Sequence, residues 1–191
     1  MIKDWKKEIF TIPNLLSLFR LLLIPVYMTI YLNASQPRHY IIAAVILAVS
    51  CLTDLIDGKI ARKFNMISTV GKILDPLADK ATQFTLIICL SIKHPVLWNL
   101  VLLFVLKEGF QLIAGLMTLR KGKMLTGAQM TGKVCTTVLF VSLIVMVLLP
   151  DISQKAVDII TIVDAIFMAV AFADYIHVYF GHGNQVQDLE M

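Results

Sequence analysis

The sequence predicts an all-α integral membrane protein with six transmembrane helices and an amphipathic interfacial helix before the first of them. The chain of 191 residues is 58% hydrophobic and 16% charged, with a mean hydropathy of +0.81. Soluble domains average about 45–50% apolar and about 25% charged residues. A helical span needs roughly 20 mostly apolar residues, and six such stretches occupy most of residues 12–180. We therefore expect residues 1–191 to form a single membrane domain.

Each expected element has its own signature in the sequence. Residues 1–11 interleave lysines with large apolar residues, which predicts a short helix on an anionic membrane surface; a charged flanking tail is the alternative. The first apolar run contains prolines and an arginine and lacks a small-residue cleavage site, so we expect a retained helix. Residues 181–191 are expected to be a cytoplasmic tail. The six expected spans are Ile12–Leu32, Tyr40–Leu55, Ile73–Ile92, Val96–Leu119, Gly132–Leu149 and Ala156–Phe180.

Lysines and arginines are unevenly distributed among the connections between these spans. Ten lie in the N-terminal segment and in connections on the same side of the membrane as that segment, and three lie in connections on the opposite side. The positive-inside rule then places both termini on the cytoplasmic side of the cell inner membrane. The net charge of +4 is explained by this loop asymmetry, so the bilayer is the expected partner and nucleic acid is not.

Four aspartates lie near the ends of two apolar segments, where a carboxylate is costly unless something pairs with it. Asp54 and Asp57 are three residues apart, and Asp75 and Asp79 are four apart, so each pair shares one face of a helix. Ordinary ion pairs with nearby lysines are the alternative. Hard oxygen ligands of this kind suit Mg²⁺ or Mn²⁺, which usually also bind substrate phosphate. Two such ions would serve a phosphoryl displacement, and we expect the four aspartates to hold them.

The residues between the two aspartate pairs fit a phosphate-containing substrate. Gly58, Ala61 and Gly71 leave the backbone open to close approach. Arg62 offers a forked pair of donors to phosphate. Pro76 directly follows an aspartate, which predicts a helix start or a kink there.

The pattern D-x2-D-G-x2-A-R-x8-G-x3-D-x3-D, which runs from Asp54 to Asp79, resembles that of the CDP-alcohol phosphatidyltransferases at every defined position. The resemblance implies six transmembrane helices, a membrane-surface helix and a homodimer. It also implies transfer of a phosphatidyl or related group from a CDP-linked donor, here CDP-diacylglycerol, to an alcohol with release of CMP. An intramembrane prenyltransferase and a divalent-cation transporter are the competing classes. Release of CMP would distinguish a CDP-alcohol phosphatidyltransferase from both.

The same resemblance implies a role for each residue of the pattern. Asp54, Asp57 and Asp75 would be metal ligands, and Asp79 would be both the general base and part of the metal site. The residues implied to bind the cytidine diphosphate are Asp54, Gly58, Ala61, Arg62 and Gly71.

Three further segments, residues 11–20, 74–80 and 132–136, are similar to phosphatidylglycerophosphate synthases. That similarity implies glycerol 3-phosphate as the acceptor, and its phosphate requires cations. Many of these synthases carry Arg-Glu in the fourth span and a second arginine further on, whereas this chain has Lys107-Glu108 and an apolar stretch near Gly115. CMP-forming cardiolipin synthases, whose acceptor is phosphatidylglycerol, share the same core and are the alternative. The candidate acceptor-binding cations are Lys107, Arg120, Lys121, Lys123 and Lys133.

Three other charged residues lie within expected spans. Arg20 is expected to pair with a carboxylate of the site or with lipid phosphate, with a purely structural ion pair as the alternative. Asp164 is deep in its span, so it is expected to have a partner or to line a polar interface. Asp174 is near the cytoplasmic end, where solvation is the default.

Overall fold

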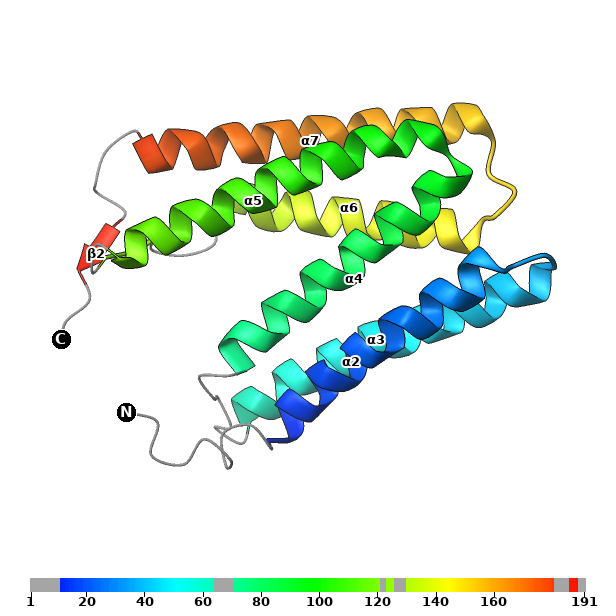
Figure 1. Cartoon of the computed structure of the whole chain (residues 1–191), viewed down its shortest axis with the longest axis horizontal. Coiled ribbons are helices and arrows are strands. Elements are labelled where there is room, and N and C mark those ends of the chain that lie inside the picture. Colours follow the sequence, from blue (N-terminus) through cyan, green and yellow to red (C-terminus); the bar gives the residue numbers. More distant parts are fainter. Residues whose placement is uncertain (1–10, 64–70, 121–122, 126–129, 181–185, 189–191) are drawn as a thin grey trace. The chain divides into compact units, whose positions relative to one another are not determined.

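Long helices dominate the part of the chain that the structure describes (Figure 1). The computed structural model describes residues 11–63, 71–120, 123–125, 130–180 and 186–188. Within these ranges, the side chains of residues 12–13, 54–63, 72–73, 118–120, 123–125 and 186–188 are outside the description. The prediction of an all-α fold is confirmed. The expected helix over residues 1–10 lies outside the described residues. The long helices are α2 (Ile12–Leu32), α3 (Pro37–Lys63), α4 (Gly71–Lys93), α5 (Trp98–Arg120), α6 (Met130–Leu148) and α7 (Gln154–Phe180), and η1 (Pro95–Leu97) is a short 3-10 turn.

Two helices extend beyond their apolar stretches, and both extensions carry candidate site residues. α3 continues past Leu55 to Lys63, and α4 begins at Gly71. The helical backbone satisfies its own hydrogen bonds through i to i−4 pairs, so a helix continues into polar sequence that hydropathy excludes. Pro76 therefore lies inside α4 and does not start it.

Four described helices are long and apolar enough, by length and composition, to cross a membrane: α2, α5, α6 and α7. The apolar part of α3 forms a shorter stretch, Pro37–Thr53. α4 has charged residues in its first turns, which dilute its apolar run. The chain is thus a multi-pass membrane protein, and the count of six spans stays a prediction.

The chain contains two compact units, residues 1–89 with 147–150 and residues 90–146 with 151–191. In the first unit, α2 and α3 form an antiparallel hairpin (Figure 1). Tyr31 stacks on Tyr27 with ring centroids 5.6 Å apart and meets Tyr40 edge-on at 5.7 Å. These rings join the two helices near their connection. The expectation of a single domain stays a prediction.

The second unit contains α5, α7 and most of α6. Phe110 of α5 packs edge-on against Phe172 of α7, with ring centroids 5.5 Å apart. Two three-residue strands, β1 (Lys123–Leu125) and β2 (Val186–Asp188), pair antiparallel. This short pairing was not expected from the sequence, which assigned residues 181–191 to a tail.

Candidate active site

Asp75 and Asp79 lie one turn apart on α4, and each contacts a polar residue of α2. The Ser17 hydroxyl donates a hydrogen bond to Asp75 Oδ1 at 2.5 Å. The Arg20 guanidinium donates from Nη1 to Asp79 Oδ1 and forms an ion pair with it. Ser17 and Arg20 are three residues apart, so they share one face of α2. The N-terminal halves of the two helices therefore meet through two polar contacts, which we call the α2–α4 polar seam.

The two sides of this seam differ in burial. The Ser17 residue is fully buried and the Arg20 side chain is 2% exposed, whereas the Asp79 side chain is 47% exposed. A buried guanidinium requires a partner, because an uncompensated buried charge is strongly destabilising. The α2 side of the seam is thus closed, whereas the Asp79 side chain is partly exposed.

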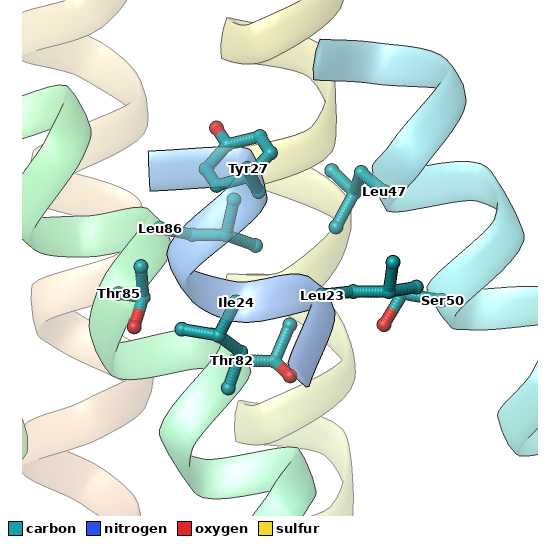
Figure 2. A pocket seen from close by; sticks show the side chains of 8 residues that line it. All are labelled: Leu23, Ile24, Tyr27, Leu47, Ser50, Thr82, Thr85 and Leu86. Carbon is teal, nitrogen blue, oxygen red and sulfur yellow. The ribbon is translucent and has the colours of Figure 1, made fainter. Parts of the chain in front are cut away.

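A small pocket lies just beyond the seam, with a volume of about 10 Å³, and it shows which helix faces converge (Figure 2). Side chains from α2, α3 and α4 all line it. Apart from hydroxyl groups, the lining is aliphatic and aromatic. The lining residues are Leu23, Ile24, Tyr27, Leu47, Ser50, Thr82, Thr85 and Leu86.

The pocket identifies the inward face of α4. Thr82 lines the pocket, and Asp79 and Asp75 precede it by three and seven residues. Positions with these offsets lie on one side of a helix. The two aspartates therefore belong to the face of α4 that meets α2 and α3.

The same reasoning applies to α3. Ser50 lines the pocket, and Asp54 and Asp57 follow it by four and seven residues along the helix. Their backbone positions therefore lie on the pocket-lining side of α3. The side chains of residues 54–63, including Gly58, Ala61 and Arg62, lie outside the description, so their roles stay predictions.

The directions of the helices bring both aspartate pairs to one end of the first unit. Ser17–Asp75 and Arg20–Asp79 pair in the same order along both chains, so α2 and α4 run parallel there. α3 runs back along α2 after the short connection at residues 33–36. The C-terminal part of α3 consequently lies at the same end as the start of α4 (Figure 1).

The structure describes the side chains of two of the four expected metal ligands. Among the described residues, no group of three or more His, Cys, Asp or Glu side chains is gathered closely enough to hold an ion. Asp75 and Asp79 are two of the four expected ligands, and the other two side chains are not described. The metal site therefore stays a prediction.

The candidate acceptor residues belong to the second unit. Lys107 is 3% exposed and donates to Glu108 Oε1 at 2.7 Å. Lys133 is exposed on α6. Arg120 ends α5 but its side chain is outside the description, as is Lys121 entirely.

Polar contacts also join the helices of the second unit. Gln111 Nε2 donates to the Tyr175 hydroxyl at 2.9 Å. The Thr131 hydroxyl donates to Asp174 at 2.5 Å, so Asp174 is held by a neighbouring helix and is not merely solvated. Ser142 donates to Asp164 Oδ1 at 3.0 Å, and Asp164 is 1% exposed, which confirms the expectation that this deep carboxyl group has a partner.

Gly132 permits the close approach of α6 to α7. A Cβ added there would lie 2.9 Å from the Tyr175 hydroxyl and 3.2 Å from its ring. We expect Gly132→Ala to lower the free energy of unfolding, because overpacking costs about 1–3 kcal/mol and exceeds the gain of up to about 1 kcal/mol from replacing a helical glycine. Thermal unfolding in detergent measures the change.

Gly115→Ala is the matched control for that substitution. Nothing lies within 4 Å of a Cβ added at Gly115, so the same replacement is expected to be neutral or stabilising by up to about 1 kcal/mol. Equal shifts of the two variants would contradict the packing role of Gly132.

Sequence reasoning assigned no role to Ser17. The signal that was available is the spacing of Asn14, Ser17 and Arg20, which places three polar residues on one face of an otherwise apolar helix. All three are 3% exposed or less. Polar residues within a span usually face the helix bundle interior, so this row marks the inward face of α2.

Known proteins match this chain over most of its length. The family model described as CDP-alcohol phosphatidyltransferase matches residues 10–175. A CDP-diacylglycerol–glycerol-3-phosphate 3-phosphatidyltransferase of Aquifex aeolicus is 34% identical over 169 residues, which cover 86% of this chain and 93% of that protein. This match includes both units.

Two other relatives have a different activity in their names. A CMP-forming cardiolipin synthase of Streptomyces coelicolor is 32% identical over 108 residues, covering 56% of this chain and 50% of that protein. A fusion of CMP-forming cardiolipin synthase with a mitochondrial hydrolase from Schizosaccharomyces pombe is 42% identical over 89 residues, and the chain spans only 14% of it. The family model and the Aquifex relative together decide the assignment: the chain belongs to the CDP-alcohol phosphatidyltransferase family.

Proposed function

We propose that the protein transfers a phosphatidyl group from CDP-diacylglycerol to glycerol 3-phosphate, forming phosphatidylglycerophosphate and releasing CMP. The observation that carries this proposal is that Asp75 and Asp79 lie on the inward face of α4, at the end of the first unit where the backbone positions of Asp54 and Asp57 also lie. That arrangement suits a diphosphate substrate, and the name of the Aquifex relative supplies the donor and the acceptor.

Asp54, Asp57, Asp75 and Asp79 would hold Mg²⁺ or Mn²⁺. The chemistry of the donor set fits, because all four offer carboxylate oxygens, which hard cations prefer. Each described carboxylate contacts α2 through Oδ1, and a carboxylate has a second oxygen with further lone pairs. When bound, two such ions would polarise the diphosphate and offset the charge that develops on departing CMP.

The protein's own residues perform the remaining steps. The backbone at Gly58, Ala61 and Gly71 would admit the diphosphate closely, and Arg62 would bind it with two donors. The acceptor oxygen attacks the phosphatidyl phosphorus, the bond from that phosphorus to the bridging oxygen breaks, and its electron pair leaves with CMP. Asp79 takes the hydroxyl proton as general base, and its 47% exposed side chain leaves room for an acceptor.

The candidates for binding the acceptor phosphate are Lys107, Arg120, Lys121 and Lys133. Lys107 already donates to Glu108 at 2.7 Å, which reduces the net charge it offers to a phosphate. This contact favours the second candidate function, a CMP-forming cardiolipin synthase whose acceptor, phosphatidylglycerol, needs fewer cations. Relatives named for that activity support the alternative.

We further propose that the chain is a homodimer in the cell inner membrane, with the aspartates facing the cytoplasm. The excess of lysines and arginines on one set of connections supports this orientation. Labelling of cysteines introduced singly at Lys3 and at Arg38 with a membrane-impermeant reagent measures it. Access to Lys3 from the outside of intact cells would contradict the proposed topology.

An acceptor panel tests the proposed function. Purified protein with CDP-diacylglycerol and Mg²⁺ is mixed in turn with glycerol 3-phosphate, phosphatidylglycerol, inositol phosphate or serine, and CMP and the lipid product are identified. We expect glycerol 3-phosphate to be the one acceptor of the four that gives a lipid product, and that product to be phosphatidylglycerophosphate. Cardiolipin from phosphatidylglycerol would select the second candidate, and the absence of CMP with every acceptor would contradict both.

A further inference from the structure

We propose that α2 is the positioning helix of the site, in which Ser17 and Arg20 fix the side-chain orientations of Asp75 and Asp79. The inference rests on the proposed function for the roles of the two aspartates. Ser17 and Arg20 are not themselves expected to touch substrate. They are expected to set how tightly the carboxylates bind a divalent cation and how well Asp79 is aligned with the acceptor hydroxyl.

The first support is that each of the two carboxylates receives a hydrogen bond from α2. Ser17 donates to Asp75 Oδ1 and Arg20 donates to Asp79 Oδ1, although the partners are 58 and 59 residues apart in sequence. Ser17 and Arg20 are three residues apart on α2, so they share one face of that helix. Asp75 and Asp79 are four residues apart on α4 and likewise share one face, and the two faces meet along parallel helices. Each carboxylate thus has its own donor from α2.

The second support is the distribution of polar and apolar residues around α2. Ser17 and Arg20 are 0% and 2% exposed, while Leu18, Phe19 and Leu22 on the other faces are 43–61% exposed. Polar side chains on a membrane helix are costly and usually functional when they face the interior of a bundle. The N-terminal half of α2 therefore turns Ser17 and Arg20 towards Asp75 and Asp79 and its large apolar side chains outwards.

The third support is the asymmetry of the Arg20–Asp79 pair. Removing the partner of a buried charge is strongly destabilising, so the buried Arg20 guanidinium requires the Asp79 carboxylate. Here the guanidinium is enclosed and the carboxylate is 47% exposed. Arg20 thus holds Asp79 through Oδ1, and the Asp79 side chain stays partly exposed beside that contact.

Groups that hydrogen-bond to metal-binding carboxylates orient them, and their loss typically costs 10–100-fold in metal affinity or activity. Ser17→Ala is therefore expected to weaken Mn²⁺ binding by about 10-fold, as measured by electron paramagnetic resonance of the purified protein without substrate. Ser50→Ala is the matched control, because Ser50 is a 5% exposed serine of the same unit that lines the pocket. It is expected to bind Mn²⁺ like the wild type. Equal affinities of all three proteins would overturn the role of Ser17.

The role of Arg20 is tested by measuring kcat and KM separately for two variants. Arg20→Lys keeps the charge but loses the planar fork, and Arg20→Gln loses both. We expect kcat to fall about 10-fold for lysine and about 100-fold for glutamine, with the KM for CDP-diacylglycerol unchanged. A raised KM with unchanged kcat would mean that Arg20 binds the substrate, and a fall in kcat matched by the loss of folded protein would mean a structural pair; either overturns the inference.

The wild-type enzyme separates this inference from the proposed function. If the wild type releases no CMP from CDP-diacylglycerol, the proposed function fails. The Mn²⁺ titrations of wild type, Ser17→Ala and Ser50→Ala do not depend on turnover, so they decide the positioning role of Ser17 in that case as well.

Discussion

Asp79→Asn is expected to abolish turnover while the protein stays folded. An amide cannot take the proton of the acceptor hydroxyl, and a positioned general base typically contributes 10²–10⁴-fold to the rate. The amide oxygen can still accept the hydrogen bond that Arg20 Nη1 donates to Asp79 Oδ1. We therefore expect a fall in kcat of at least about 100-fold, measured by CMP release, with an intact size-exclusion profile.

Asp151→Asn is the matched control for loss of a carboxylate. Asp151 is exposed in the connection between α6 and α7, so the same chemical change there should leave kcat unaltered. Near-normal turnover of Asp79→Asn would remove Asp79 as the base and leave it at most a structural partner of Arg20.

Asp57→Ala is expected to lose Mg²⁺-dependent binding of CDP-diacylglycerol. Its position on the inward side of α3, seven residues after Ser50, suits a ligand at the end of the unit where Asp75 and Asp79 lie. Removal of a carboxylate ligand lowers the charge and the ligand count on which affinity for a hard cation depends. Binding of a labelled CDP-diacylglycerol in detergent micelles, titrated with Mg²⁺, measures the effect.

Asp158→Ala provides the comparison for Asp57→Ala. Asp158 lies on α7 and accepts a hydrogen bond from Gln154 at 2.9 Å, in the unit that does not contain the aspartate pairs. Its loss is expected to leave Mg²⁺-dependent binding unchanged. If Asp57→Ala also binds normally, Asp57 is not a metal ligand, and the four-carboxylate site is contradicted.

The helices could be predicted because each depends mainly on residues that are close together in the sequence. Runs of apolar residues that are long enough to span a bilayer are visible in the sequence, and α2, α5, α6 and α7 follow them closely. The extension of α3 to Lys63 was not visible in hydropathy. The three-residue spacing of Asp54 and Asp57 nevertheless implied a helix there, because residues three apart share a face in a helix and lie on opposite faces of a strand.

The contacts between helices could not be predicted with the same ease. In a membrane protein the lipid-facing side chains are as apolar as the packed ones, so hydropathy does not show which face of a helix turns inward. Leu22 and Leu86 are chemically alike, yet Leu22 is 61% exposed and Leu86 is 1% exposed. The structure also shows that Lys107 donates to Glu108 at 2.7 Å, a contact that adjacent positions on a helix do not by themselves imply.

Composition and short-range spacing along the chain were enough to predict the membrane class, the main helices and the two aspartate pairs, because these features depend on residues that are close in sequence. The tertiary structure decided which donors meet Asp75 and Asp79. Ser17 and Arg20 reach them from 58 and 59 residues away, and that meeting depends on the rotation and register of α2 against α4. Packing of whole helices sets both quantities.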